Sequence, residues 1–132
     1  MTVFVDTSAL LAVLIQTDQN HAKAATAWER GIEERLDFVT SNYVVVELLA
    51  LVQRRLGLQT VRAVVQGMLP VLRVLWVDES LHELGLASVL ASSRGRLSLV
   101  DGTSFAAMRQ HGIDEAFAFD RHFSEQGFSL FA

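Results

Sequence analysis

The sequence predicts an α/β domain in three layers, with a mainly parallel central sheet of about four to five strands. Two observations lead to this prediction. The apolar run that follows Thr2 shows no polar alternation, which is typical of a strand buried on both faces of a parallel sheet, and a further strand is expected over 115–119. One or two helical segments separate consecutive strands, and parallel neighbours need such crossovers. Right-handed crossovers then bring the carboxyl ends of the strands to one edge of the sheet.

The first strand and the first helix meet at Asp6. Thr2 to Val5 is largely apolar and β-branched, and a helical pattern follows from Ser8 to Gln16. Asp6 can cap this helix, since Asp-Thr-Ser is a favourable N-terminal sequence. In open α/β sheets ligands lie at the carboxyl ends of the strands, so a role in binding or chemistry stays open beside capping.

The middle of the chain continues the alternation of helices and strands. A polar loop over 17–20 leads to a helix over 21–36 with apolar residues at helical spacing, and then to a strand over 37–40. Ser41 or Asn42 is expected to cap a helix that runs to Leu56 and ends at Gly57. A helix over 58–69 ends at Pro70, and a strand follows over 71–77.

Two further helices and two strands complete the chain. A helix that begins at Asp78 fades near 92–95, and another over 99–111 closes at His111 and Gly112. The strand over 115–119 ends at Asp120, and a small edge strand is expected over 128–131. Asp6 and Asp120 should therefore share one edge of the sheet.

Composition limits the class of protein. A length of 132 residues favours one domain over 1–132, and charged residues interrupt every apolar stretch before it could span a bilayer. No leader-like segment opens the chain, so we expect a cytoplasmic location and no membrane partner. The absence of cysteine excludes disulfides and thiolate metal sites, which leaves oxygen and histidine as metal ligands.

The net charge of −4 argues weakly against a nucleic-acid partner. One region has the opposite character, because it contains four arginines and no acidic residue between positions 54 and 73. Arg54, Arg55 and Arg62, together with Arg121 after the fourth strand, are candidate contacts to an RNA backbone. The alternative is that the arginines of 54–73 occupy a solvated helix face.

Four carboxylates form the candidate site: Asp6, Glu47, Asp101 and Asp120. Glu47 has apolar helical neighbours and should project from a buried face, unless it pairs with an arginine or lies at an exposed helix edge. Asp101 fits a capping box with Ser98, yet a carboxylate in the first turn of a helix at the sheet edge can also face a cation.

An oxygen-only ligand set suits Mg²⁺ or Mn²⁺ better than zinc. Such ions activate water for attack on a phosphodiester, and clustered carboxylates without a cation should have raised pKa values. We expect Thr7, Ser8 or Thr103 to orient the attacking water. His122 follows Asp120 closely and could be a ligand or a base, although a surface or packing role is commoner for a lone histidine.

These motifs resemble those of the PIN-domain ribonucleases, and in particular the toxins of VapBC toxin–antitoxin pairs. The resemblance lies in four segments, Val5–Leu10, Val46–Leu48, Leu97–Ala106 and Phe119–Phe123. It implies a three-layer α/β/α PIN-like fold, endoribonuclease activity dependent on Mg²⁺ or Mn²⁺, a homodimer, and inhibition by a cognate antitoxin protein. It also implies that catalysis and metal binding both belong to Asp6, Glu47, Asp101 and Asp120. Ala118 departs from the pattern, because many members carry a hydroxyl residue there.

Two other functions stay open. A protein-binding module could keep this fold with an idle site and use its surface apolar residues for a partner. A haloacid-dehalogenase-type phosphatase also begins with an Asp after its first strand. That family needs a second Asp two positions on, where this chain has Ser8, and no downstream lysine completes its set. Affinity for Mn²⁺ would separate an idle module from a nuclease.

Overall fold

Five parallel strands form the sheet of the computed structural model, which describes residues 1–92 and 95–132. Their order is β3-β2-β1-β4-β5, and every neighbouring pair is parallel. The strands are Thr2–Val5 (β1), Asp37–Ser41 (β2), Arg73–Leu75 (β3), Glu115–Phe117 (β4) and Ser129–Leu130 (β5). The central strand β1 pairs with β4, so the segments that follow these two strands start side by side. The predicted parallel sheet is confirmed.

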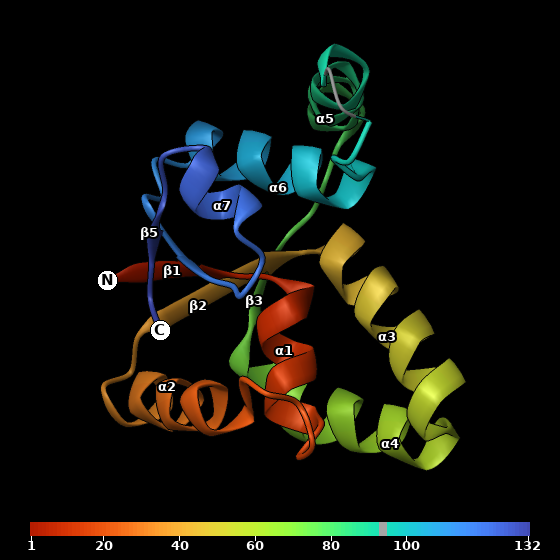
Figure 1. Ribbon diagram of the computed structural model, residues 1–132, viewed down its shortest axis with the longest axis vertical. Helices are drawn as coiled ribbons and strands as arrows, with labels where there is room; N and C mark the ends of the chain where they lie inside the picture. The colour runs from red at the N-terminus through yellow and green to blue at the C-terminus, as the bar shows by residue number, and fades with distance from the viewer. Residues whose placement is uncertain (93–94) are drawn as a thin grey trace.

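Helices cover both sides of this sheet (Figure 1). α5, α6 and α7 lie on one side of the strands, α1, α2 and α4 lie on the other, and α3 begins where β2 ends. The helices are Thr7–Leu14 (α1), His21–Glu33 (α2), Asn42–Leu56 (α3), Leu58–Ala63 (α4), Glu79–Ala91 (α5), Leu99–Gln110 (α6) and His122–Glu125 (α7). The three-layer α/β/α architecture is therefore confirmed. Among the described helices, none combines the length and the apolar character that a bilayer crossing requires.

Helix boundaries near the candidate site follow from capping residues. Ser41 Oγ accepts a main-chain N–H from the first turn of α3, and Ser98 Oγ does the same for α6. Gly57, with φ of 88°, ends α3, and Gly112, with φ of 64°, follows α6. Positive φ is a conformation that glycine adopts at little cost, which is why these helices stop at the predicted positions.

Several predicted boundaries are wrong. The helix expected over 58–69 is α4 followed by a π-helical turn, Val64–Met68, and a 3₁₀ turn, Leu69–Val71. Because Pro70 belongs to that 3₁₀ turn, β3 is shorter than the strand expected over 71–77. The helix expected over 21–36 ends at Glu33, since Arg35 has a φ of 54°. β4 ends at Phe117 rather than at 119, and part of the fading helix end expected over 92–95 lies outside the described residues.

An aromatic cluster holds α2 against the sheet. Phe38 of β2 stacks on Trp28 at a centroid distance of 5.4 Å and on Phe117 of β4 at 6.0 Å. Gly31 faces the Phe38 ring so closely that a Cβ atom there would lie 2.0 Å from its Cζ. This packing lies on the side of the sheet away from α6, so it supports the strands without taking part in the candidate site (Figure 1).

Candidate functional site

Asp6 lies at the junction of β1 and α1, where it caps the helix and remains almost fully buried. Its backbone N–H donates to the Phe117 carbonyl at 3.0 Å, which continues the pairing of β1 with β4. Its carboxylate is 4% exposed and accepts the Ser8 N–H at 3.1 Å and the Ser8 hydroxyl at 2.7 Å. Burial raises the pKa of Asp6 to about 7, and the charges of Asp101 and Asp120 add to the rise, against the Ser8 bonds that lower it.

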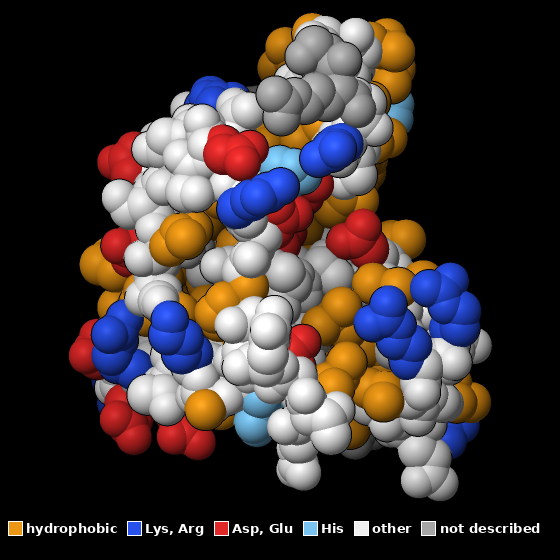
Figure 2. Space-filling view, viewed as in Figure 1, with side chains coloured by type: hydrophobic (Ala, Val, Ile, Leu, Met, Phe, Trp, Pro, Cys, Tyr) orange, Lys and Arg blue, Asp and Glu red, His pale blue; other side chains and the backbone are white. Residues whose placement is uncertain are grey.

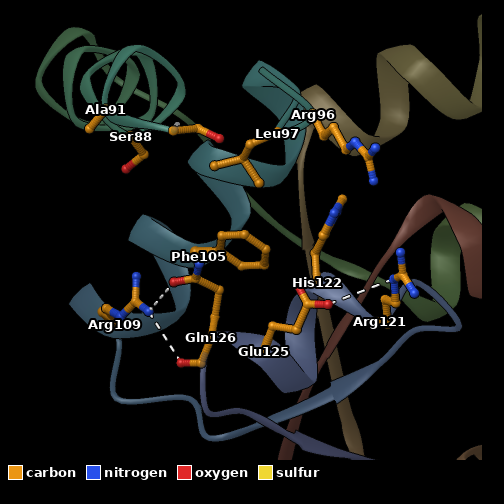
Figure 3. Close-up of a pocket in the computed structure, with 11 residues that line it drawn as sticks. Ser88, Ala91, Arg96, Leu97, Phe105, Arg109, Arg121, His122, Glu125 and Gln126 are labelled. Atoms are coloured by element: carbon orange, nitrogen blue, oxygen red, sulfur yellow. Dashed lines mark hydrogen bonds and ion pairs between the residues drawn. The ribbon is translucent and has the colours of Figure 1, made fainter. Parts of the chain in front are cut away.

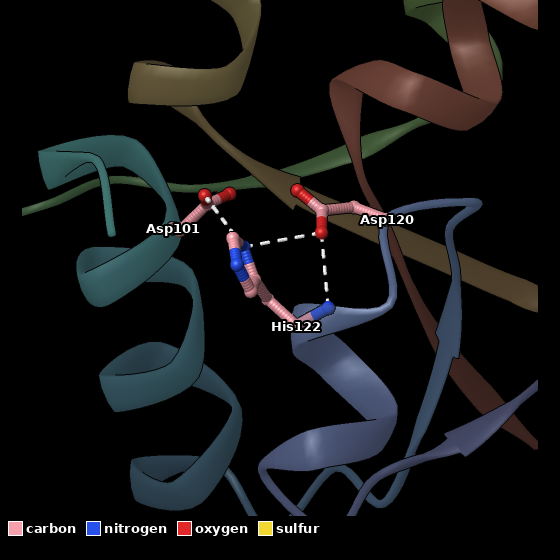
Figure 4. Close-up of side chains that lie close together, drawn as sticks. All are labelled: Asp101, Asp120 and His122. Carbon is pink, nitrogen blue, oxygen red and sulfur yellow. Dashed lines mark hydrogen bonds and ion pairs between the residues drawn. The ribbon is translucent and has the colours of Figure 1, made fainter. Parts of the chain in front are cut away.

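Asp101, Asp120 and His122 form a compact cluster (Figure 4). His122 Nδ1 lies 3.1 Å from Asp120 Oδ1 and 3.8 Å from Asp101 Oδ2, so its ring sits between the two carboxylates. The His122 main-chain N–H also donates to Asp120 Oδ1 at 2.9 Å. One ligand atom from each of the three residues lies within 4.8 Å of the others. The structure therefore places His122 at the carboxylates, where sequence reasoning favoured a surface or packing role.

The position of Asp101 depends on a close crossing of α5 and α6. A Cβ atom on Gly102 would lie 2.7 Å from the Gly85 carbonyl oxygen, so both residues allow the two helices to approach. Burial raises the pKa of the Asp101 carboxyl, and the negative charges of Asp120 and Glu47 raise it further, while His122 lowers it. The pKa of Asp101 is thus raised by carboxylates from two places, Glu47 of α3 and Asp120 in the segment after β4.

Glu47 lies at the margin of the buried face of α3. The buried residues of this helix are Val44, Leu48 and Val52, and Glu47 is only partly buried beside them. Glu47 therefore lies at the edge of the buried face that its apolar neighbours predict, next to Val46, which is 67% exposed. Among the described residues, no ion pair to an arginine involves Glu47.

The three predicted water-orienting hydroxyls have different surroundings. The Ser8 hydroxyl donates to Asp6 and accepts the Phe119 N–H at 3.0 Å. It therefore fixes the backbone directly after Ala118, a buried residue that has no hydroxyl of its own. The buried Thr7 hydroxyl has no partner among the described residues. Thr103 does not face the carboxylates, since a Cβ on Gly85 would lie 2.2 Å from its Oγ1. Two positions along a helix turn a side chain by about 200°, which directs Thr103 to α5 rather than to the site of Asp101.

The predicted RNA-contacting arginines divide into two groups. Arg54 and Arg55 lie in the last turn of α3 and Arg62 in the last turn of α4, and all three are exposed. Arg121 precedes α7 and lies beside His122. Figure 2 shows basic side chains on either side of a hollow that holds acidic and histidine side chains, and a second basic group over α3. The two groups therefore flank the candidate site from different sides.

The donor set fits a hard divalent cation. Carboxylate oxygens dominate it, one imidazole lies among them, and all of the clustered side chains are at least partly buried. Raised pKa values at Asp6 and Asp101 show that negative charge is costly here, and a cation would compensate that cost.

Fold and site together define an α/β protein with a cluster of acidic residues, of the kind that binds a cation, at the carboxyl ends of the strands of a parallel sheet. The chain belongs to the PIN domain family, whose model matches residues 3–129. It is 36% identical over 127 residues to the 23S rRNA-specific endonuclease VapC20 of Mycobacterium tuberculosis, a match that covers 96% of this chain and 95% of the relative.

Solved structures give the same result. The crystal structure of M. tuberculosis VapC20, described as a sarcin–ricin loop cleaving toxin, matches with a TM-score of 0.85 at 35% identity and covers 96% of this chain and 95% of that one. FitAcB from Neisseria gonorrhoeae matches with a TM-score of 0.72 at 20% identity, covering 100% of this chain and 97% of that one. This second likeness supports the fold alone.

Proposed function

We propose that this chain is an endoribonuclease that depends on a divalent cation, and that it is the toxin of a toxin–antitoxin pair. The observation that carries the proposal is the cluster of Asp101, Asp120 and His122 beside Asp6, in a chain 36% identical to an RNA endonuclease. Raised carboxyl pKa values without a cation are the electrostatic property expected of a metal site of this kind.

Asp6, Glu47, Asp101 and Asp120 are the residues that would hold Mg²⁺ or Mn²⁺. Such an ion, when bound, supplies a Lewis acid and an activated water for hydrolysis of a phosphodiester. The other side chains prepare the site. The Ser8 hydroxyl lowers the pKa of Asp6 against the effect of burial, and His122 lowers that of Asp101.

Thr7 and the arginines complete the proposed machinery. The Thr7 hydroxyl is buried at the start of α1 and has no partner among the described residues, so it is available to orient a water beside Asp6. Arg54, Arg55, Arg62 and Arg121 would hold the RNA backbone by charge-assisted hydrogen bonds to phosphate. The substrate class we propose is a ribosomal RNA loop, by similarity to VapC20.

A homodimer and an antitoxin partner belong to the same proposal. Trp76 and Leu90 are each 78% exposed, and Val46 is 67% exposed, although all three are large apolar side chains. Exposed apolar side chains in such numbers are typical of surfaces that another protein covers. We propose that a second copy of the chain and a small antitoxin cover them, with the site residues confined to each protomer.

The test is cleavage of a hairpin RNA that carries the sarcin–ricin loop, with Mn²⁺ or Mg²⁺ and with a chelator. Wild-type protein should cut the hairpin only with the cation, and Asp101→Asn, purified identically, should lose at least about 10²-fold in rate. Asp114→Asn is the matched control, because Asp114 is an exposed carboxylate outside the cluster. Absence of both cutting and Mn²⁺ affinity in the wild type would instead indicate an idle protein-binding module.

A further inference from the structure

A pocket of about 480 Å³ lies beside the carboxylate cluster and shares His122 with it (Figure 3). Its walls come from the end of α5, the segment before α6, α6 itself and α7. Three arginines line the pocket, Arg96, Arg109 and Arg121, whereas the only acid among the described lining residues is Glu125. A positively charged pocket therefore adjoins the acidic centre, with one histidine ring between them.

The arginine that α6 contributes to the pocket, Arg109, is held in place by its own neighbours. Arg109 Nη2 donates to Gln126 Oε1 at 2.9 Å and to the Gln126 carbonyl at 3.3 Å. Its guanidinium carbon also lies 5.2 Å from the centre of the Phe128 ring, which is cation–π geometry. This wall of the pocket thus has a fixed positive charge.

Arg96 and Arg121 differ from Arg109 because the protein scarcely engages them. Arg121 Nε lies 3.7 Å from Glu125 Oε1, between side chains that are 78% and 57% exposed, and such a pair contributes little. Arg96 is exposed and makes no hydrogen bond or ion pair to the residues that the structure describes. Figure 3 shows both guanidinium groups on the same side of His122. Two guanidinium groups with free donors are therefore available for an anion there.

On the basis of the function proposed above, we propose that this pocket binds one nucleotide of the RNA next to the cleaved bond. Arg96 and Arg121 contact its phosphate, and Arg109 lines the pocket from α6. A guanidinium group binds phosphate through two parallel hydrogen bonds, and a pocket of this volume suits a ligand of nucleotide size. The shared wall at His122 places that phosphate beside Asp101 and Asp120, where the neighbouring phosphodiester would be cleaved.

Replacement of Glu125 should change RNA affinity in the direction opposite to replacement of the arginines. Its carboxylate faces Arg121 and repels an incoming phosphate, so RNA binding must displace the Arg121–Glu125 pair. Glu125→Gln should therefore strengthen RNA binding, whereas Arg96→Gln and Arg121→Gln should weaken it. If these residues only supported the fold, all three substitutions would weaken RNA binding. Opposite changes in RNA affinity therefore indicate that their charges act on the RNA.

The experiment measures affinity for the sarcin–ricin hairpin RNA at several salt concentrations, in a chelator so that no cutting occurs. We expect the Arg96→Gln/Arg121→Gln double variant to bind about tenfold more weakly, with a slope of log affinity against log salt smaller by about 0.7 per lost phosphate contact. Glu125→Gln should bind severalfold more tightly. Glu29→Gln, exposed on α2, carries the charge change of Glu125→Gln away from the pocket, and Lys23→Gln on the same helix carries that of each single arginine variant; both controls should match the wild type.

Mn²⁺ affinity and metal-dependent cutting, measured on the same proteins, separate this proposal from the proposed function. Loss of RNA affinity with unchanged Mn²⁺ affinity supports the pocket, even if the wild type cuts no RNA. Metal-dependent cutting together with arginine variants that bind RNA like Lys23→Gln would overturn the pocket and leave the nuclease intact. If the double variant fails to fold, Glu125→Gln decides alone: binding equal to that of Glu29→Gln overturns the proposal.

Discussion

Ser8 and Phe119 are 111 positions apart, yet the Phe119 N–H donates to Ser8 Oγ at 3.0 Å. The same hydroxyl donates to Asp6 Oδ2 at 2.7 Å. One side chain therefore joins the carboxylate at the end of β1 to the segment that carries Asp120, and it fixes the separation of two proposed metal ligands.

Replacement of Ser8 should affect both stability and metal binding. Ser8→Ala leaves the Phe119 N–H without a partner and removes the hydroxyl donor of the Asp6 carboxylate, which keeps only the main-chain N–H of residue 8. We therefore expect the free energy of unfolding to fall by about 1–3 kcal/mol. Loss of the bond also raises the pKa of Asp6 further and weakens Mn²⁺ binding at neutral pH. Chemical denaturation and a Mn²⁺ titration measure the two effects. The control is Ser129→Ala, an exposed serine of β5; equal behaviour of the two variants would contradict the prediction.

The stability of the metal-free protein should fall as the pH rises. The pKa of Asp6 is about 7 in the folded protein against an ordinary value of 3.8, so the folded protein binds this proton more tightly than the unfolded chain does. Its stabilising contribution is complete below about pH 4 and is lost as the pH rises through about 7. Asp101, whose pKa is also raised, acts in the same direction.

Asp6→Asn isolates this effect, because asparagine keeps an oxygen for the cap of α1. In a chelator at pH 8 the variant should have a higher free energy of unfolding than the wild type, and the difference should shrink toward pH 5. Denaturant titrations at a series of pH values measure it. A wild type that loses no more stability than Asp6→Asn over this range would show that the buried carboxylate is not the cause.

Addition of a divalent cation should reverse the loss of stability that the buried carboxylates cause at neutral pH. Mn²⁺ at about 100 times its dissociation constant should stabilise the wild type by about 2.7 kcal/mol, because only the folded chain presents the cluster. Asp120→Asn should lose most of this gain, whereas Asp114→Asn should keep it, since Asp114 is exposed and outside the cluster. Thermal melts with and without Mn²⁺ provide the measurement, and equal gains in both variants would exclude Asp120 as a ligand.

The sequence predicted those features of the fold and the site that depend on the residues of a single segment. Apolar strands that end in Asp6 and Asp120 predicted both the sheet and the edge at which these carboxylates meet. Other positions depend on segments that are distant in sequence. The ring of His122 reaches the carboxylates because of α7, a four-residue helix too short to show periodicity. Thr103 faces away from the site because α5 crosses α6 at Gly85, a contact that no local pattern records.

That crossing gives the last prediction. A Cβ on Gly85 would lie 2.2 Å from Thr103 Oγ1 and 2.9 Å from the Thr103 Cα, so Gly85→Ala must push α6 away from α5. We expect a loss of about 1–3 kcal/mol in the free energy of unfolding, as for other overpacked sites.

Because Asp101 lies in the first turn of α6, the same shift should move its carboxylate from Asp120 and weaken Mn²⁺ binding. Gly67→Ala is the matched control, since no atom of the described residues lies within 4 Å of a Cβ there, and it should leave both properties near their wild-type values. Denaturation and Mn²⁺ titration of the two variants separate the outcomes. A Gly85→Ala protein that is destabilised but binds Mn²⁺ normally would show that the helix crossing supports the fold without setting the position of Asp101.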